Sequence, residues 1–507
     1  MSPLNRRTLI VGGIAGGVTA AGLTVASAGV APPLSYPFKL GVASGEPWAD
    51  GFVLWTRLAP HPLDADGLGG MSNTTVPVDW QVSTNQSFTG IVASGTFTAT
   101  QAWAHSVHVE VSGLTAGTWY YYRFRAAGHI SPVGRTRTAP AVGTSPAMTM
   151  LFTSCSHYES GYFTAYRRMA EETPDVILHL GDYIYEGKAG SGVRSHSPAV
   201  EISSLADYRV RHAQYKTDPD LQAAHHIAPW ITVWDDHEVE NNYAGLTRAD
   251  SSPAGDFAAR RTAAYKAYYE HMPLRAAQAP SGANLQLYRR LRWGSLATFH
   301  MLDTRQYRDD QACGDGTKLC PAADDPQRTI TGAAQESWLL NGLNQKLGTW
   351  DLIGQQVFFA QKLAAADGSK SMDSWDGYTA NRTRIQNGWD AQGNDSVVVL
   401  TGDVHRSWAA NIMHDYAAQD RIIGTELITT SVTSSGDGNA AENALDPALN
   451  PHVKFYKNLR GYVRTVTSAG QMNVDFRFVD KVTVRDRPVT TAQSYVIHAG
   501  NPGLQAS

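Results

Sequence analysis

Side chains that can bind metal ions follow four short apolar runs in this 507-residue chain. Short runs rich in β-branched and aromatic residues that end at turn residues are typical of buried strands. In open α/β sheets, ligands bind beyond the carboxyl ends of the strands. Four such ends therefore predict one metal site assembled from the whole sheet. The residues at these ends are Cys155, Asp182, Tyr185, Asp235, Asp236, His237, Glu238, Asp403 and His405.

The first two ends offer a thiol, a carboxylate and a phenol. Asp182 and Tyr185 stand three residues apart. A carboxylate can bridge two cations through its two oxygens, and a phenolate is a hard anionic donor that favours a ferric ion over zinc or magnesium. The alternative is an Asp that caps a strand and a Tyr that packs in the core. Cys155 is either a metal ligand or, as is usual for a free cysteine, a small buried hydrophobe.

The third end places three carboxylates and one imidazole in the four residues 235–238. Adjacent acids repel one another unless a positive charge lies between them, so this pattern indicates a bound cation. A solvated acidic turn that caps a helix is the alternative. His237 is a candidate to protonate the leaving group or to hold a phosphate oxygen, and Glu238 is the candidate to orient its ring.

The fourth end carries Asp403 and His405, two residues apart, which places both side chains on the same side of an extended segment. Each would then give one ligand to one of two ions. The alternative is an Asp that only supports a structural His. A further apolar run ends at Asp303, and Arg305 lies just beyond it. Arg305 is a candidate to bind phosphate, with a surface salt bridge as its alternative role.

The elements that must position these residues change in type along the chain. Residues 36–140 contain short strands separated by turns, which predicts a small all-β sandwich of immunoglobulin or fibronectin type. From residue 147 onward, strands alternate with helices at 162–172, 256–270 and 334–346. This alternation predicts a large α/β domain with a layered sheet, closed by further strands near the C-terminus.

The N-terminus carries the pattern of an export signal. Arg6 and Arg7 precede a stretch rich in Gly and Ala that ends in small residues, which predicts a twin-arginine signal peptide at 1–28. A membrane anchor helix is the alternative. We therefore expect export through the twin-arginine translocation machinery, a secreted or periplasmic location, and no transmembrane segment in the mature chain.

The charge balance and the cysteines indicate which partners and which compartment to expect. The chain has 42 Lys and Arg against 46 Asp and Glu, a formal net charge of −4. This balance argues against a broad basic surface, so we expect no stable nucleic-acid complex. Cys313 and Cys320 lie in one polar, Gly-containing loop. In an oxidising compartment they are expected to form a disulfide; two unpaired surface thiols are the alternative.

Taken together, these motifs resemble those of the PhoD-like alkaline phosphatases and phosphodiesterases, a branch of the calcineurin-like metallophosphoesterases. The resemblance covers nearly the whole mature chain, with the catalytic domain at 147–500 preceded by the β-sandwich domain. The segments that carry it are 154–166, 179–186, 234–242 and 400–405.

The resemblance implies a centre that contains a ferric ion and calcium. By this resemblance, calcium has Asp236 and Asp403 as further ligands and shares Asp182 with the ferric ion. Many relatives have Asn in place of Asp236 and His in place of Asp403, and carboxylates at both positions favour calcium over zinc or manganese. Asn242 and Asp303 are candidates for a second calcium. The ferric ligands implied are Cys155, Asp182, Tyr185 and His405.

The resemblance also implies the reaction, which is hydrolysis of phosphate esters by a metal-activated hydroxide. The expected substrates are small phosphorylated molecules, and phosphodiesters or phospholipid head groups are the alternative, as for a phosphodiesterase or a phospholipase D. A secreted surface-binding protein without activity is a third interpretation. Residues 186–229 are a candidate lid, with an ordinary insertion as the alternative. Its cations would attract anionic substrate: Lys188, Arg194, Arg209, Arg211 and Lys216.

Overall fold

The computed structural model describes residues 34–249 and 256–507. The predicted signal peptide at 1–28 lies outside the described residues. Within the described part of the chain, no helix is both long and apolar enough to cross a membrane. The predicted mixed α/β class is confirmed, because several sheets and a smaller set of helices alternate along residues 148–428.

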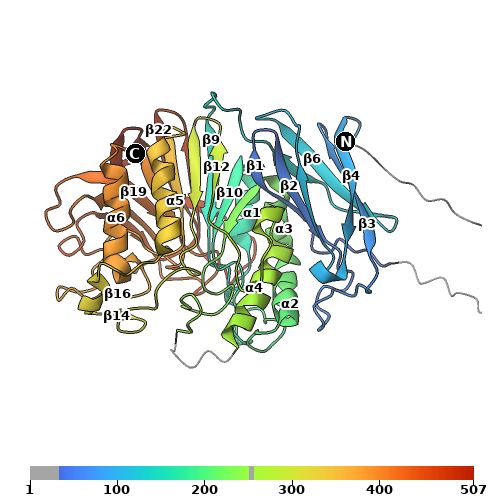
Figure 1. Ribbon diagram of the computed structural model, residues 1–507, viewed down its shortest axis with the longest axis horizontal. Helices are drawn as coiled ribbons and strands as arrows, with labels where there is room; N and C mark the ends of the chain where they lie inside the picture. The colour runs from blue at the N-terminus through green and yellow to red at the C-terminus, as the bar shows by residue number, and fades with distance from the viewer. Residues whose placement is uncertain (1–33, 250–255) are drawn as a thin grey trace, which may run out of the picture. The chain divides into compact units, whose positions relative to one another are not determined.

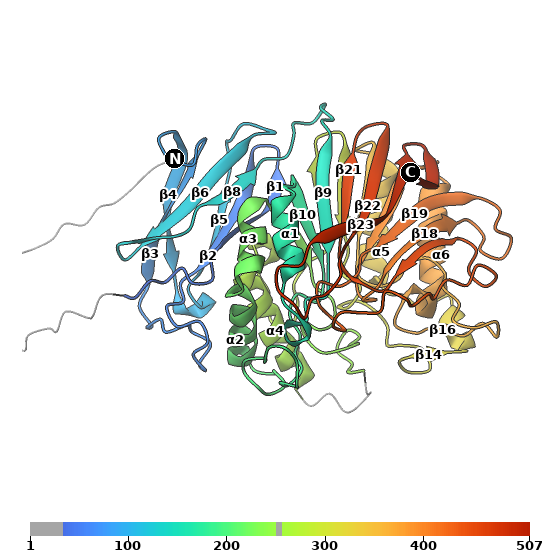
Figure 2. The same ribbon diagram turned by 180° about the vertical axis from the view of Figure 1, so that it is seen from behind.

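Two large mixed sheets dominate the described residues (Figures 1 and 2). The ten-stranded sheet has the order β24 (Asn501–Ala506), β23 (Val489–His498), β22 (Gln471–Val479), β21 (Arg460–Thr467), β9 (Met148–Thr153), β10 (Val176–Leu180), β11 (Trp230–Val233), β1 (Val42–Trp48), β2 (Gly51–Arg57) and β5 (Ser106–Val111). The seven-stranded sheet has the order β12 (Arg289–Trp293), β13 (Ala297–Met301), β15 (Trp350–Gly354), β17 (Val397–Thr401), β19 (Ile422–Ile428), β18 (Ser407–Met413) and β20 (Val453–Lys457).

The alternation of side chains along β17 shows how the layers stack. Val398 and Leu400 belong to the core cluster that also contains β9, β10 and β11, so this face meets the ten-stranded sheet. Val397 and Val399 point the opposite way, as the strand period of two requires. They belong to the second core cluster with α5 (Gly332–Gln345) and α6 (Thr379–Asp390), which lie side by side in Figure 1.

The strands of residues 36–140 are divided between two sheets. β4 (Ile91–Ala99), β3 (Val76–Ser83), β6 (Trp119–Ala126), β7 (His129–Ile130) and β8 (Gly134–Arg137) form a separate five-stranded sheet. β1, β2 and β5 instead extend the ten-stranded sheet, with β1 parallel to β11. The two sheets contact each other through Phe52 and Tyr120, whose ring centroids are 6.0 Å apart. The predicted sandwich thus shares one sheet with the α/β part, and its status as a separate domain stays a prediction.

The three predicted helices are confirmed. They are α1 (Thr164–Glu171), α4 (Phe257–His271) and α5, and Asp256 accepts a hydrogen bond from Ala259 N at the start of α4. The sequence analysis missed α2 (Leu205–Lys216), α3 (Pro219–Ile227) and α6. Local signals for two of them were present: Ser204 and Asp207 form a capping box before α2, and Asp218 caps α3 ahead of Pro219.

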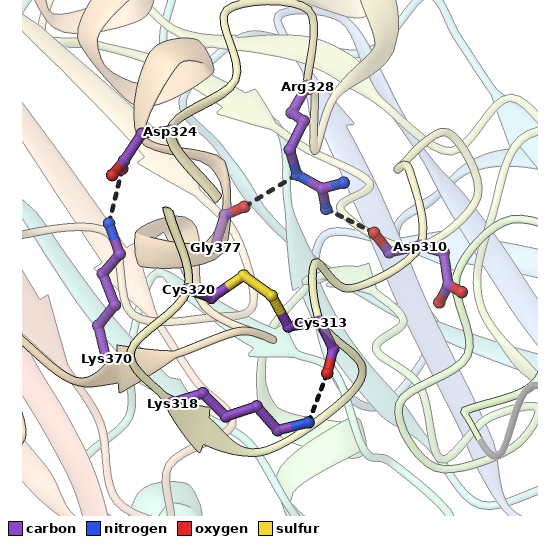
Figure 3. The surroundings of a disulfide bond; sticks show 8 residues. All are labelled: Asp310, Cys313, Lys318, Cys320, Asp324, Arg328, Lys370 and Gly377. Carbon is purple, nitrogen blue, oxygen red and sulfur yellow. Dashed lines mark hydrogen bonds and ion pairs between the residues drawn. A yellow bond between two sulfur atoms is a disulfide. The ribbon is translucent and has the colours of Figure 1, made fainter. Parts of the chain in front are cut away.

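The predicted disulfide between Cys313 and Cys320 is confirmed (Figure 3). It closes a short loop that contains β14 (Thr317–Lys318). This strand pairs with β16 (Lys370–Ser371) in a two-stranded sheet. Around it, the Lys318 ammonium donates to the Cys313 carbonyl at 2.6 Å, and Lys370 pairs with Asp324 at 2.7 Å. The loop is therefore held by the disulfide, by an internal hydrogen bond and by the pairing of β14 with β16.

Candidate metal centre

The carboxyl ends of β9, β10, β11 and β17 meet because two glycines allow close approach of the backbones. A Cβ atom on Gly181 would lie 2.4 Å from the Asp235 Cβ, and one on Gly402 would lie 2.9 Å from the Ser154 Cβ. Either contact is far shorter than packing allows. Glycine at these two positions thus brings the strand ends of both sheets to one place.

Five of the residues nominated from the sequence have left-handed backbone conformations. The φ angles are +62° for Cys155, +56° for Asp182, +53° for Asn242, +63° for Asp403 and +53° for His405. For residues other than glycine this conformation costs on the order of 1–3 kcal/mol, and it clusters at functional sites where the surrounding fold imposes it. Sixteen non-glycine residues of the described chain have positive φ, and these nominated residues are among them.

One group of donors forms around Asp182. Ligand atoms of Cys155, Asp182 and His405 all lie within 4.8 Å of one another. The Tyr185 hydroxyl donates to Asp182 Oδ2 at 2.9 Å and lies 3.0 Å from His405 Nε2. Ser434 donates to the same hydroxyl at 2.7 Å. The structure therefore brings the four expected ferric ligands together.

Electrostatics in this group favour a bound cation. Burial raises the pKa of the Cys155 thiol well above its usual value, and the charge of Asp182 raises it further. Burial likewise raises the pKa of Asp182, where the charges of Asp236 and Asp235 add to the effect. Burial and Asp182 also raise the pKa of the Tyr185 phenol. These donors would be anionic only beside a positive charge, which a metal ion supplies.

A second group of donors shares Asp182 with the first. Ligand atoms of Asp182, Asp236 and His237 lie within 4.8 Å of one another. His237 Nδ1 lies 2.6 Å from Glu186 Oε2, and the His237 amide donates to Asp236 Oδ1 at 2.9 Å. Burial acts to lower the pKa of His237, but Glu186 and Asp236 more than offset it, so this pKa lies well above the usual value. The imidazole is thereby held as the protonated form.

The predicted role of Glu238 is wrong. Its carboxylate accepts hydrogen bonds from the backbone amides of Asp182 and Asp235, at 3.0 and 2.8 Å, and also from that of Tyr183. Glu238 therefore joins the ends of β10 and β11, and Glu186 is the residue that orients His237. The sequence analysis did not find Glu186, although it directly follows Tyr185.

The predicted phosphate contact of Arg305 does not fit the geometry. Its side chain has no exposed surface. Nη1 and Nη2 donate to Asp373 at 2.7 and 2.8 Å, and Nε donates to Asp235. Nη2 also lies 3.8 Å from Asp236 Oδ2. The guanidinium therefore stabilises buried carboxylates behind the centre and has no face turned to substrate.

Comparison with known proteins supports one family. The model of the PhoD-like phosphatases matches residues 150–476, and that of their N-terminal domain matches residues 24–140. The chain belongs to the PhoD-like phosphatase family. It is 48% identical over 487 residues to alkaline phosphatase D of Bacillus subtilis (strain 168), covering 93% of this chain and 82% of that protein.

Solved structures agree with this family. One described as the structure of PhoD is 47% identical, with a TM-score of 0.90, and the match covers 93% of this chain and 92% of that one. A purple acid phosphatase from yellow lupin (Lupinus luteus) seeds is 13% identical, with a TM-score of 0.55, covering 92% of this chain and 74% of that one. The second match shows a shared fold alone.

The remaining ligands expected from the PhoD-like family are less closely gathered. Asp403 belongs to neither donor group, although burial and the charge of Asp235 raise its pKa well above the usual value. Asn242 donates through its backbone amide to Asp236 Oδ2 at 2.6 Å. Asp303 already accepts hydrogen bonds from the Arg305 and Gln306 amides, at 3.0 and 2.9 Å. Asp303 thus shapes its own loop, and the calcium roles of Asp403 and Asn242 stay predictions.

The cations of residues 186–229 do not form a charged lid. Arg209 pairs with Glu270 at 2.7 Å, Arg194 pairs with Asp218 at 2.7 Å, and the buried Arg211 donates to backbone carbonyls. The Lys216 ammonium is buried 3.0 Å from His225 Nε2. These four residues hold the helices and loops of this segment together, and among the five predicted cations only Lys188 is exposed.

A third group of potential ligands borders the centre. It contains His157, Glu159 and His196. Glu159 already accepts hydrogen bonds from the amides of Gly190 and His196, at 3.0 Å each. The His157 ring packs edge-on against the Tyr185 ring, with centroids 4.7 Å apart. Glu159 therefore fixes the loop around residue 190, and His157 packs beside the donor group of Asp182.

Proposed function

We propose that this chain hydrolyses phosphate esters at a two-metal centre that is bridged by Asp182. The observation that carries the proposal is the position of Asp182, which belongs to both donor groups beside the His237–Glu186 pair. Membership of the PhoD-like phosphatases and the 48% identity to alkaline phosphatase D support phosphoric ester hydrolysis as the reaction.

The donor types suggest different ions for the two groups. Cys155, Tyr185 and His405 combine thiolate, phenolate and imidazole, a set that suits a ferric ion. Asp236 and Asp403 offer only oxygen, as calcium prefers. Two cations bound there would neutralise charge on the phosphoryl oxygens and activate water for attack on phosphorus. Asp182, with one oxygen towards each group, would set the spacing of the two ions.

His237 is proposed to protonate the leaving oxygen and to contact the phosphoryl group. Its Nδ1 is engaged by Glu186, so Nε2–H is the group free to donate. Glu186 and Asp236 raise the pKa of His237, which keeps this proton available at neutral and alkaline pH. Because Glu186 lies outside both donor groups, its effect persists when cations neutralise Asp182 and Asp236.

The proposal includes a location and a domain arrangement. We propose export by the twin-arginine route, a secreted or periplasmic enzyme, a β-sandwich at 36–140 and a layered metallophosphoesterase-type domain at 147–500. The disulfide between Cys313 and Cys320 supports an oxidising compartment. Replacement of both Arg6 and Arg7 by Lys should retain the protein inside the cell, as measured by cell fractionation. Unchanged export would contradict this route.

Phosphodiester hydrolysis is the second candidate function. A cavity of about 520 Å³ borders the loop that carries Asp403 and His405 and leaves room for a second ester group. Phospholipase D activity on lipid head groups is one form of it. The third interpretation, a surface-binding protein without activity, receives no support from the close gathering of the donors.

The decisive assay uses the purified, metal-loaded protein with p-nitrophenyl phosphate and bis(p-nitrophenyl) phosphate, each with and without a calcium chelator. We expect hydrolysis of the monoester that is lost on chelation. Faster hydrolysis of the diester would favour the second candidate. No hydrolysis of either substrate would exclude the proposed function. Elemental analysis should find iron and calcium, and thiolate or phenolate charge transfer should colour the protein.

A further inference from the structure

The cavity of about 520 Å³ lies beside the loop that carries His405, one of the candidate ligands. Val404 and Arg406 line it, and these two residues enclose His405 in the sequence. Lys362 and Trp408 form a second part of the lining, and the loop that precedes β20 forms a third. A substrate whose phosphoryl group lies at the donor groups would therefore have this cavity as a neighbouring space for its remainder.

Two cations face the cavity with donor atoms to spare. The Lys362 ammonium lies 5.2 Å from the Trp408 ring centroid, and within the described residues it makes no hydrogen bond or ion pair with a carboxylate. Arg406 donates through Nε to Glu442 and to the Tyr456 hydroxyl, at 3.1 Å each. Its two terminal nitrogens are left for another partner among the described contacts.

The carboxylates of the cavity are already engaged. Glu442 accepts from Arg406 and also from Asn458 Nδ2 at 2.8 Å. Asp446 caps its own turn, accepting the amides of Ala448 and Leu449 at 3.1 Å each. The positive charge of Lys362 consequently has no carboxylate of the cavity wall to neutralise it.

The two cations also act on each other. Partial burial lowers the pKa of Lys362, Asp376 opposes this effect, and Arg406 lowers the pKa again. Asp376 itself is bound by Arg382 at 2.6 Å. An anion placed between Lys362 and Arg406 would relieve their repulsion and gain hydrogen bonds from both.

The rest of the lining is largely apolar. Trp408 packs against Tyr456 with ring centroids 4.4 Å apart. Further apolar side chains complete the wall, namely Leu363, Leu445, Leu449 and Val453. An occupant with carbon atoms as well as a negative charge suits such a mixed surface better than a free inorganic ion.

We propose that this cavity receives the leaving-group half of the substrate and selects leaving groups that carry a second negative charge. The inference rests on the proposed function, because it assumes that a phosphoryl group is bound at the neighbouring donor groups. Lys362 and Arg406 are the specificity-determining residues, and Trp408 is the surface on which the organic part packs.

The test compares two small monoesters that differ in one group of the leaving alcohol. 3-Phosphoglycerate has a carboxylate where glycerol 3-phosphate has a hydroxymethyl group. We expect the kcat/KM ratio of the first to the second, measured by phosphate release, to exceed one in the wild type. Lys362→Met should lower this ratio roughly tenfold, as loss of one charge-assisted hydrogen bond predicts. Arg406→Gln should lower it in the same direction.

Lys346→Met is the matched control. Lys346 donates to the carbonyls of Gln392 and Gly393, ahead of the amino end of β17, whereas the centre lies at its carboxyl end. The ratio should not change in this variant. Circular dichroism of each variant checks folding. If Lys362→Met does not fold, the kcat/KM ratio of Arg406→Gln tests the proposal.

The outcomes separate this inference from the proposed function. A wild-type ratio near one, or a ratio unchanged in both variants, would overturn the leaving-group site while hydrolysis itself stands. The same holds if the wild type hydrolyses p-nitrophenyl phosphate but neither glycerol ester. If the metal-loaded wild type hydrolyses none of the three monoesters, the proposed function and this inference are both refuted.

Discussion

Two neighbouring groups of side chains differ in how the negative charge of their acidic members is compensated. The sulfur-containing group consists of Cys155, Asp182, Tyr185 and His405. The arginine-bound group consists of Asp235, Asp236 and Asp373, which surround Arg305. All of these residues are buried except His405, which is half-buried, and both groups lie at or behind the same strand ends. Only the second contains its own permanent cation.

The pKa directions express this difference. Burial acts to raise the pKa of Asp236, yet Arg305 and His237 bring it below its usual value. In the sulfur-containing group, burial raises the pKa of Cys155 and that of Asp182, and neighbouring carboxylates raise both further. In the arginine-bound group Arg305 also lowers the pKa of Asp373, although burial still raises that of Asp235 to about 7. Arg305 thus compensates most of that group's charge, while the sulfur-containing group is prepared for a cation from outside.

The largest expected effect is that of Asp182→Asn, which removes the residue common to both donor groups. Replacing the carboxylate by an amide should lower kcat/KM by roughly a thousandfold or more, on the scale of losing a central electrostatic contact. It should also lower the metal content found by elemental analysis. The fold should persist because an amide of the same size is left. Asp79→Asn, on an exposed face of β3, is the matched control. A mild loss in Asp182→Asn would refute the bridging role.

Arg305→Met tests the other side of the comparison. The variant would leave Asp235 and Asp373 buried without their cation, and breaking a buried pair in this way costs about 3–5 kcal/mol. The free energy of unfolding, measured by denaturant titration, should fall accordingly. Arg487→Met, which removes an exposed pair with Asp480, should not change it measurably. Equal stability of the two variants would show that Arg305 is not needed to compensate the carboxylates.

Glu186→Gln sharpens the comparison at His237, whose amide donates to Asp236 of the arginine-bound group at 2.9 Å and to Asp182 of the sulfur-containing group at 3.4 Å. Glu186 raises the pKa of His237 above 6.5, the ordinary pKa of a histidine. His237 therefore stays protonated when the pH rises above 6.5. Protonation of His237 therefore adds stability that is full below pH 6.5 and is lost as pH rises through its folded pKa. The Glu186 charge on which this depends is lost as pH falls through the lowered pKa of Glu186.

Without the Glu186 charge, the pKa of His237 falls, and the alkaline limb of the kcat/KM profile should move about one pH unit lower. Glu172→Gln, which affects a carboxylate paired with Arg464 and Arg477, is the control and should leave the profile in place. An unmoved limb in Glu186→Gln would show that His237 is not the acid.

The part of the site that depends on local sequence could be predicted. A buried strand followed by a turn is visible in one stretch of chain, and the nominated Cys155, Asp182, Tyr185 and His405 do meet. The ends of α2 and α3 were visible too, since Ser204 and Asp218 are ordinary capping residues that the sequence analysis did not use.

The partners that compensate the charges of the buried side chains could not be predicted from local sequence. Arg305 binds Asp235 and Asp373, which are 70 and 68 residues away in sequence. Glu186 reaches His237 across 51 residues. No spacing pattern specifies such pairs, because register between strands and the packing of loops decides them. For the same reason the arginines of 186–229 looked like a charged lid, whereas the fold supplies each with a carboxylate or carbonyl partner.

The smallest expected effect concerns the disulfide loop, which is linked to the arginine-bound group through Asn242. Asp315 of this loop accepts from Asn242 Nδ2 at 2.8 Å, and the Asn242 amide donates to Asp236 at 2.6 Å. The double variant Cys313→Ser, Cys320→Ser should lose about 2 kcal/mol of unfolding free energy, the value for so short a closed loop.

Its kcat/KM should change only a few-fold, because Arg305 and the His237 amide hold Asp236 independently of the loop. Reduction of the wild-type disulfide should reproduce both effects. If the double variant instead lost activity as Asp182→Asn does, the arginine-bound group would depend on the loop, and its self-sufficiency would be disproved.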